Sequence, residues 1–247
     1  MIQTNPSADR FVFASSVAAE LWQPRKDAEA CEWWHFDALS DDGREAVVIV
    51  FMDDLARSLH NDAGNGSQSE RLRSPALSCT YFADGKIVYR SEQRFAAEEF
   101  SASESELKCR IGNSGFRFGT ATYGSGFLVS VDLSLPKGRR LRANFEWLSV
   151  ESDLAAPPAN ISQAVRLWNM AVPRSDVSGR ITVDDSRRRV SHSHSFRGTG
   201  YHDHNRETRR TAEAISERHW GRAHFADSTV VFRRSAEVVD ERPATEL

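Results

Sequence analysis

Alternation of apolar and polar residues with a period of two is the dominant pattern along this chain. From residue 127 to residue 135 every odd-numbered position is apolar, and three of the four even-numbered positions are polar. Residues 141–147 repeat the pattern, and the intervening residues 136–139 (Pro-Lys-Gly-Arg) are typical of a turn. Side chains alternate between the two faces of a strand, so this region predicts a β-hairpin with one buried face.

Other segments point to the same class of structure. Asp84-Gly85 separates two short apolar segments and predicts a tight hairpin turn, and residues 112–115 predict another. Residues 47–52 form a continuous apolar run, which is typical of a central strand. Helical periodicity is weak and limited to one or two turns within residues 212–218. We therefore predict an all-β fold, an antiparallel barrel or sandwich, and small barrels of this kind can enclose one apolar ligand.

The chain divides at residues 151–160, where Pro157-Pro158 interrupts the pattern. We predict an N-terminal lead-in segment, a first β subdomain, a second β segment that completes the same lobe, and a polar tail. Their ranges are 1–30, 31–150, 161–232 and 233–247.

Composition narrows the classes of function. A length of 247 residues is enough to bury a core, and a formal charge of −3 gives no indication of nucleic acid as a partner. The three cysteines are far apart and form no Cys-x-x-Cys pair, so neither a disulfide framework nor a structural zinc site is expected. No signal-like leader and no run of about 20 apolar residues is present. We expect a cytoplasmic protein that could contact a membrane only peripherally.

The first motif with chemical potential is Glu-Trp-Trp-His-Phe-Asp at residues 32–37. On a strand, one face would carry Trp33, His35 and Asp37, and the other Glu32, Trp34 and Phe36. The motif is either a core strand with a hydrogen-bonded histidine or an aromatic wall with an acid and an imidazole at a pocket.

The second motif is Tyr-His-Asp-His-Asn at residues 201–205, after Gly198-Thr199-Gly200. Tyr201, Asp203 and Asn205 would share one face of a strand, with His202 and His204 on the other. So many titratable groups are unusual for an ordinary strand, although a solvated edge strand remains an alternative. His-x-His spacing recurs at residues 192–194, so a metal site is a further alternative, but we expect no metal.

The third motif, residues 219–225, places Trp220, Arg222 and His224 on one face of a strand. An indole and a guanidinium there could flank a carboxylate, or they could be a core tryptophan beside a surface arginine.

Taken together and in this order, the three motifs resemble the carotenoid 1,2-hydratase (hydroxyneurosporene synthase) family and its lipocalin-like relatives, over roughly residues 30–232. The resemblance implies a lipocalin-like fold, a hydrophobic isoprenoid or carotenoid substrate, and no cofactor. Two features depart from the family pattern. Arg206-Glu207 stands where the family usually has Trp-Gly, and the second β lobe usual after the Trp-Gly-Arg strand is missing. The sequence would then be a shortened version of the family, a fragment, or a chain whose partner supplies that lobe.

The chemistry implied by the resemblance is addition of water across a terminal C=C bond. Asp203 is the candidate acid, because burial in an apolar pocket raises the pKa of a carboxyl group. His202 and His204 would orient groups or relay the proton, and Tyr201 and Asn205 would position the water. The substrate-binding candidates are Trp33, Trp34, His35, Phe36, Trp220 and Arg222. On a regular strand Asp203 and the two histidines face opposite ways, and a bulge or turn after Gly200 would bring them together.

Three other functions fit the same residues. A non-catalytic carrier would use the polar run only as a structural network. A terpenoid cyclase would let an internal alkene, instead of water, capture the cation. A metalloenzyme would require His202 and His204 as ligands.

Overall fold

The computed structural model describes residues 11–23, 30–55, 73–121, 123–149, 166–208 and 215–237. Nearly all of them are in strands: β1 Phe11–Ala14, β2 Ala30–Ser40, β3 Glu45–Met52, β4 Ala76–Ala83, β5 Lys86–Arg94, β6 Phe100–Ala102, β7 Lys108–Ile111, β8 Ser114–Ala121, β9 Gly124–Leu135, β10 Arg139–Ser149, β11 Arg166–Asp185, β12 Val190–Thr208, β13 Ile215–His224 and β14 Thr229–Glu237. Three single-turn 3₁₀ helices are η1 Val17–Glu20, η2 Ala97–Glu99 and η3 Pro136–Gly138. The predicted all-β class is confirmed.

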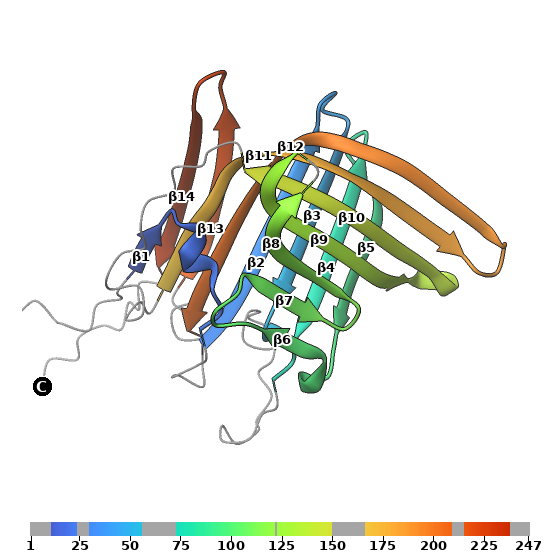
Figure 1. The fold of residues 1–247 in the computed structure, drawn as a ribbon, viewed down its shortest axis with the longest axis horizontal. Helices are drawn as coiled ribbons and strands as arrows, with labels where there is room; N and C mark the ends of the chain where they lie inside the picture. Colours follow the sequence, from blue (N-terminus) through green and yellow to red (C-terminus); the bar gives the residue numbers. More distant parts are fainter. Residues whose placement is uncertain are drawn as a thin grey trace, which may run out of the picture.

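Twelve strands form one curled sheet, in the order β5-β4-β3-β2-β12-β11-β10-β9-β8-β7-β6, with β1 added in parallel to β11 (Figure 1). All other neighbours in this sheet are antiparallel. The curl brings β5 against β9, where the Ser91 hydroxyl donates a hydrogen bond to the Ser134 carbonyl at 2.7 Å. The result is a lipocalin-like half-barrel, and β13 and β14 pair separately as a two-stranded hairpin.

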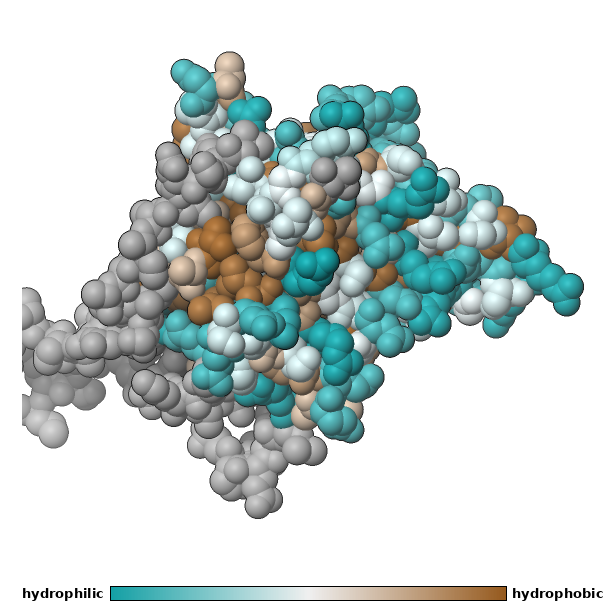
Figure 2. Space-filling model, viewed as in Figure 1, coloured by the Kyte–Doolittle hydropathy of each residue, from teal (hydrophilic) through white to brown (hydrophobic). Residues whose placement is uncertain are grey.

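The inner face of the curled sheet holds the core. Phe36 lies at its centre, with ring centroids 5.3–5.7 Å from Phe116, Phe127 and Trp147. These side chains are at most 4% exposed, so aromatic rings fill the middle of the half-barrel. Figure 2 shows apolar side chains gathered in the middle of the molecule, while hydrophilic ones cover the extended ends of the long strands.

The predicted hairpins are confirmed. Asp84 and Gly85 have φ of 49° and 72°, the left-handed values that the tight turn between β4 and β5 requires. The hairpin predicted around residues 136–139 is β9–β10, and residues 47–52 lie in β3 between β2 and β4. One expectation is wrong: residues 215–218 are strand rather than helical turn, and residues 212–214 lie outside the described part.

The segments predicted on either side of residues 151–160 share the one sheet, because β10 pairs with β11 along its whole length. The predicted lead-in segment contributes β1 and η1, and β14 runs five residues into the predicted polar tail. The interruption itself lies outside the described residues. Within the described ranges, no helix is long and apolar enough to cross a membrane.

β11 has two irregularities where it pairs with the polar run of β12. Between Asn169 and Ser175, β11 uses two more residues than the facing part of β12, so two bulges lie side by side. Pro173, which has no backbone N–H to donate, lies in this stretch. β12 remains regular, so its side chains keep strict alternation between the two faces of the sheet.

Candidate functional site

The polar run on β12 is divided between the two faces of the sheet. β12 pairs with β2 without a register shift from Gly198 to Thr208. Tyr201, Asp203 and Asn205 therefore lie on the outer face, and His202 and His204 lie on the inner face. The bulge or turn after Gly200 that would have brought these side chains together does not form in β12. Asp203 and the two histidines do not line one pocket, and the expected direct relay of a proton between them is not supported.

The glycines before the run have a packing role. A side chain on Gly200 would collide with Trp147 and Val177 on the inner face, and one on Gly198 would collide with the backbone of Leu39. These positions require glycine because the neighbouring groups approach the strand closely, not because the strand turns.

Asp203 is held by three hydrogen-bond donors in a nearly closed environment. Its Oδ2 accepts from the Trp168 indole Nε1 and from the Tyr201 hydroxyl, each at 2.8 Å. Its Oδ1 accepts from the Asn205 side-chain amide at 2.7 Å. Only 7% of Asp203 is exposed, so the position of its carboxyl group is fixed by the protein and not by solvent.

Beside Asp203 lies a cavity of about 80 Å³. Its walls are tryptophan rings together with a few polar side chains: Trp33, His35, Trp168, Asp203, Asn205, Trp220 and Arg233. The hairpin β13–β14 forms the outer wall, where Trp220 stacks on Tyr201 with centroids 5.4 Å apart. The Arg233 guanidinium lies 5.5 Å from the ring centroid of Trp168. The cavity is therefore aromatic, with one carboxyl group and one imidazole facing it.

The imidazole that faces the cavity, His35, also belongs to a buried charged cluster with Asp37 and Arg222. His35 lies directly across from Asp203 in the β2–β12 register, and its Nε2 is 3.0 Å from Oδ2 of Asp37. The other oxygen of Asp37 pairs with Arg222 from β13. Burial lowers the pKa of His35, but the hydrogen bond to Asp37 and the attraction of the nearby acidic groups together outweigh it, so the net shift is upward. Burial likewise raises the pKa of Asp37, and its bonds to His35 and Arg222 turn the net shift downward.

On the inner face, His202 contacts Glu20 of η1, with Nε2 2.8 Å from Oε2. The other ring nitrogen, Nδ1, faces the backbone carbonyl of His35 at 3.0 Å and must donate to it. Burial raises the pKa of Glu20 to about 8 and lowers that of His202 to about 3. Near neutral pH the pair is uncharged, and the protonated Glu20 donates to Nε2 of His202.

His204 forms the second inner pair, with its Nε2 3.0 Å from Oε2 of Glu32. Burial lowers the pKa of His204, but the hydrogen bond to Glu32 and the other interactions with nearby groups together outweigh it, and the net shift is upward. Both imidazoles stack on aromatic rings, His204 on Trp34 at 4.7 Å and His202 on Phe36 at 3.9 Å. The inner histidines thus hold η1 against the sheet and belong to the core.

The structure therefore sorts the predicted residues into two sets. The outer set surrounds the cavity or its walls: Trp33, His35, Tyr201, Asp203, Asn205, Trp220 and Arg222. The inner set lies in the core: Trp34, Phe36, His202 and His204. Sequence reasoning missed Trp168, Arg233 and Glu20. Trp168 lies on β11, Arg233 on the hairpin and Glu20 on η1, each far in sequence from its partner, and no local motif marks any of them.

A metal centre is not formed by the residues considered for it. In the described ranges, no three His, Cys, Asp or Glu side chains gather as ligands. His192 and His194 lie toward the other end of β12, where the His194 ring is 5.1 Å from that of Tyr81. They cannot join His202 and His204 at one ion.

No family model matches the chain. It is 24% identical, over 82% of its length, to a protein of Chlorobaculum tepidum named hydroxyneurosporene dehydrogenase, and it spans 56% of that protein. Among solved structures, it matches one described as a candidate AttH from Nitrosomonas europaea, with a TM-score of 0.53 and 12% identity over 91% of this chain and 68% of the other. CghA with Sch210972 matches at a TM-score of 0.47, with 14% identity over 85% of this chain and 58% of the other. The predicted resemblance to the hydroxyneurosporene-related proteins, on a lipocalin-like all-β fold, is therefore confirmed.

Proposed function

We propose that this chain carries an acid site that adds water across the terminal C=C bond of an acyclic carotenoid or a related isoprenoid, without a cofactor. The observation that carries the proposal is the carboxyl group of Asp203, fixed by three donors at the edge of a tryptophan-walled cavity. The similarity to a protein named for a hydroxylated neurosporene supports a substrate of this class.

The proposed reaction begins with Asp203 in its protonated form. The π electrons of the C1=C2 bond take the proton onto C2, which leaves a tertiary cation at C1 and a carboxylate on Asp203. A water oxygen then bonds to C1, and the proton that it releases returns to the carboxylate. The donors from Trp168, Tyr201 and Asn205 stabilise the carboxylate between the two steps.

The cation requires an environment that stabilises positive charge without reacting with it. Trp33, Trp168 and Trp220 offer ring faces to the cavity, and a desolvated cation–π contact contributes about 2 kcal/mol. The Arg233 guanidinium already lies over the Trp168 ring, which supports that face as a cation site. A substrate cation would take the place of this guanidinium. Trp34 and Phe36 are not proposed for this role, because they lie in the core.

The substrate needs more room than the cavity provides. A volume of about 80 Å³ holds a few water molecules, whereas sites for small organic ligands are usually about 300–1,000 Å³. The hairpin β13–β14 forms one wall and does not pair with the strands of the large sheet. Side chains tie it to that sheet, through the Arg222–Asp37 ion pair and a hydrogen bond from Arg174 to the Phe225 carbonyl. We propose that movement of this hairpin admits the end of the polyene.

The test is expression of the chain in cells that accumulate lycopene or neurosporene, followed by mass-resolved pigment analysis. Asp203→Asn keeps the shape of the side chain and removes the acid. Asp184→Asn is the matched control, since Asp184 lies on the surface and pairs with Arg142. We expect a product heavier by one water from the parent and from the control, and none from Asp203→Asn.

Other products would give different answers. A new pigment lacking two hydrogens would indicate dehydrogenation, as the name of the Chlorobaculum relative describes. An isomer of unchanged mass would indicate cyclisation. Equal conversion by the parent and by Asp203→Asn would show that Asp203 is not the acid.

A further inference from the structure

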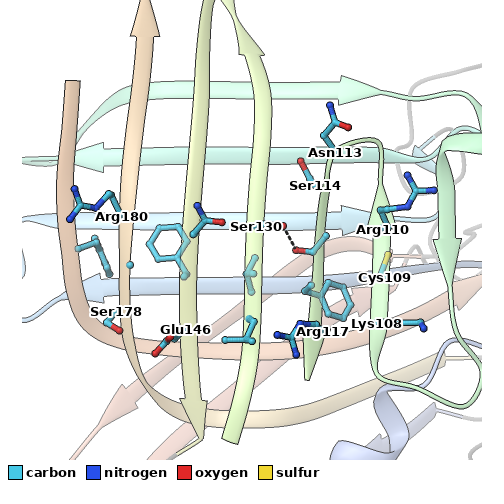
Figure 3. Close-up of a pocket in the computed structure, with 18 of the residues that line it drawn as sticks. Lys108, Cys109, Arg110, Asn113, Ser114, Arg117, Ser130, Glu146, Ser178 and Arg180 are labelled. Carbon is cyan, nitrogen blue, oxygen red and sulfur yellow. Dashed lines mark hydrogen bonds between the residues drawn. The ribbon is translucent and has the colours of Figure 1, made fainter. Parts of the chain in front are cut away.

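A second cavity lies away from Asp203. It is a groove of about 910 Å³ across the outer face of β7–β12 (Figure 3). On β12 it includes Arg197, which lies six residues from Asp203 and on the same face of that regular strand. Six residues of extended strand span roughly 20 Å. The groove and the Asp203 cavity therefore lie on the same side of the sheet but are separate.

The strand register explains the shape of the groove. Two adjacent rows of side chains cross it from strand to strand, one from Ser195 to Arg110 and one from Arg197 to Lys108. The middle of the first row consists of Asn144, Ser130 and Gly115, which are short or medium in length. Long basic side chains stand toward the ends of the rows. Small residues between long ones leave a hollow with basic edges, whose lining is largely apolar and includes a few polar side chains such as Ser130 and Asn144.

The charge of the groove differs from that of the whole chain. Five cationic side chains and one acidic side chain line it: Lys108, Arg110, Arg117, Arg180, Arg197 and Glu146. The chain as a whole carries −3. In Figure 3, Arg180 and Ser178 lie on one side of the groove and Arg110, Arg117 and Lys108 on the other, with Ser130 and Glu146 between them.

These basic side chains are available to a ligand. Lys108 pairs with Glu106, and Arg197 with Asp41 at 3.9 Å, but both pairs are exposed and such pairs contribute little. Within the described ranges, Arg117 and Arg180 form no ion pair. A multivalent anionic surface could therefore contact these groups without breaking a strong interaction.

A second feature favours a lipid surface over a dissolved anion. Tyr123, in the β8–β9 turn, borders the groove and is 87% exposed. Tyrosine is enriched at membrane–water interfaces, where its ring meets the headgroup region and its hydroxyl stays hydrated. Basic side chains beside an exposed aromatic ring are typical of proteins that contact anionic membranes.

We propose that this basic groove binds the phosphate-bearing headgroups of an anionic membrane and holds the outer face of the sheet, with the Asp203 cavity, toward the bilayer. The proposal rests on the proposed function in one respect, because an apolar polyene is taken from a membrane. The arginine edges would contact the phosphates, and the serine and asparagine side chains of the lining would bind the hydroxyl groups of the headgroup.

The test measures vesicle binding of the full chain by co-sedimentation, without turnover. Vesicles contain phosphatidylcholine alone or with about one third phosphatidylglycerol. The variant Arg117→Glu/Arg180→Glu reverses two charges in the groove. The control Lys86→Glu/Arg90→Glu makes the same change on exposed residues of β5, outside the groove. We expect the parent and the control to bind anionic vesicles, with an affinity that falls as the salt concentration rises. The groove variant should bind these vesicles with an affinity at least about tenfold lower.

Three results would overturn the proposal. One is equal vesicle binding by the parent and the groove variant, and another is no binding of the parent to anionic vesicles. The third is binding of glycerol 1-phosphate or a single-stranded oligonucleotide in the groove while vesicles stay unbound. Turnover of detergent-dispersed substrate should be the same in the parent and the groove variant, so a failure of the proposed reaction and a failure of the groove are distinguishable.

Discussion

The carboxyl group of Asp203 is the most strongly positioned functional group in the structure. Trp168, Tyr201 and Asn205 each direct a donor at it, and none of the three can be removed without leaving a buried acceptor less satisfied. Burial and the neighbouring Asp203 raise the pKa of Tyr201, so its hydroxyl keeps its proton and can go on donating. In the proposed reaction, these donors would keep the carboxyl group in one position while it gives up a proton and takes it back.

Trp168→Phe tests this positioning at the level of one bond. The change keeps an aromatic ring at the cavity and removes the indole N–H that donates to Asp203. We expect turnover to fall about tenfold, as loss of one hydrogen bond to a charged group in the transition state would produce, with a small change in melting temperature. Trp33→Phe is the control, because it alters another ring of the cavity and leaves the bonds to Asp203 intact. Equal losses in the two variants would argue against a role for the N–H.

At the scale of elements, η1 and β12 are joined by a buried polar network. Glu20 contacts His202, and the Asn169 side chain from β11 donates to the other oxygen of Glu20. His202 in turn donates to the backbone of His35 in β2. Four segments far apart in the sequence meet at this point. The bond from His202 to the His35 backbone supports the β2–β12 register. That register places His35 opposite Asp203 on the outer face of the sheet.

The network predicts a specific dependence of stability on pH. The pKa of Glu20 is about 8 in the folded protein, against an ordinary value of 4.5. Between these pH values the folded state keeps a proton on Glu20 that the unfolded state has lost. The free energy of unfolding therefore falls as pH rises over this range. His202 has a pKa of about 3 when folded and an ordinary value of 6.5, so its contribution rises with pH over that range. The two effects oppose each other between pH 4.5 and 6.5. The net loss lies between pH 6.5 and 8, at up to about 1.4 kcal/mol per pH unit.

Glu20→Gln isolates this effect. The amide of glutamine can donate to His202 and accept from Asn169, as the protonated acid does. We expect the variant to stay as stable as the parent at pH 6 and to show a smaller decline between pH 6.5 and 8, measured by chemical denaturation, because His35 and His204 also have raised pKa values and keep their part of the decline. Glu98→Gln, at an exposed position, should retain the decline. Marked destabilisation of Glu20→Gln at pH 6 would mean that Glu20 is charged in the folded state.

At the scale of the whole molecule, the large sheet and the hairpin β13–β14 have separate tasks. The main hydrophobic cluster is drawn from the large sheet, and none of the hairpin side chains that the structure describes belongs to it. The hairpin supplies Trp220, Arg222 and Arg233 to the cavity. Folding and assembly of the candidate site therefore depend on different parts of the chain.

A chain that stops after Thr208 should separate these tasks. We expect its β-sheet circular dichroism to be retained and its melting temperature to fall by only a few degrees, while conversion of the polyene is lost. Loss of the folded sheet would show that the hairpin belongs to the core. Unchanged conversion would show that the outer wall of the cavity is dispensable.

The sequence by itself determined the all-β class, the principal hairpins and the faces of two site strands. Period-two alternation is a local property, so it assigns Trp33 and His35 to one face of their strand, and Tyr201, Asp203 and Asn205 to one face of theirs. The same alternation already set His202 and His204 apart from Asp203, and the regular pairing of β12 with β2 keeps them on opposite faces.

The tertiary structure decided which face of each strand became the core and which became the cavity. That choice depends on the direction in which the sheet curls and on the bulges in β11, and neither leaves a pattern in one short segment. It also brought Trp168, Arg233 and Glu20 to their partners across separations of 35 residues or more. Contacts of that range arise from strand pairing and packing, which local periodicity does not encode.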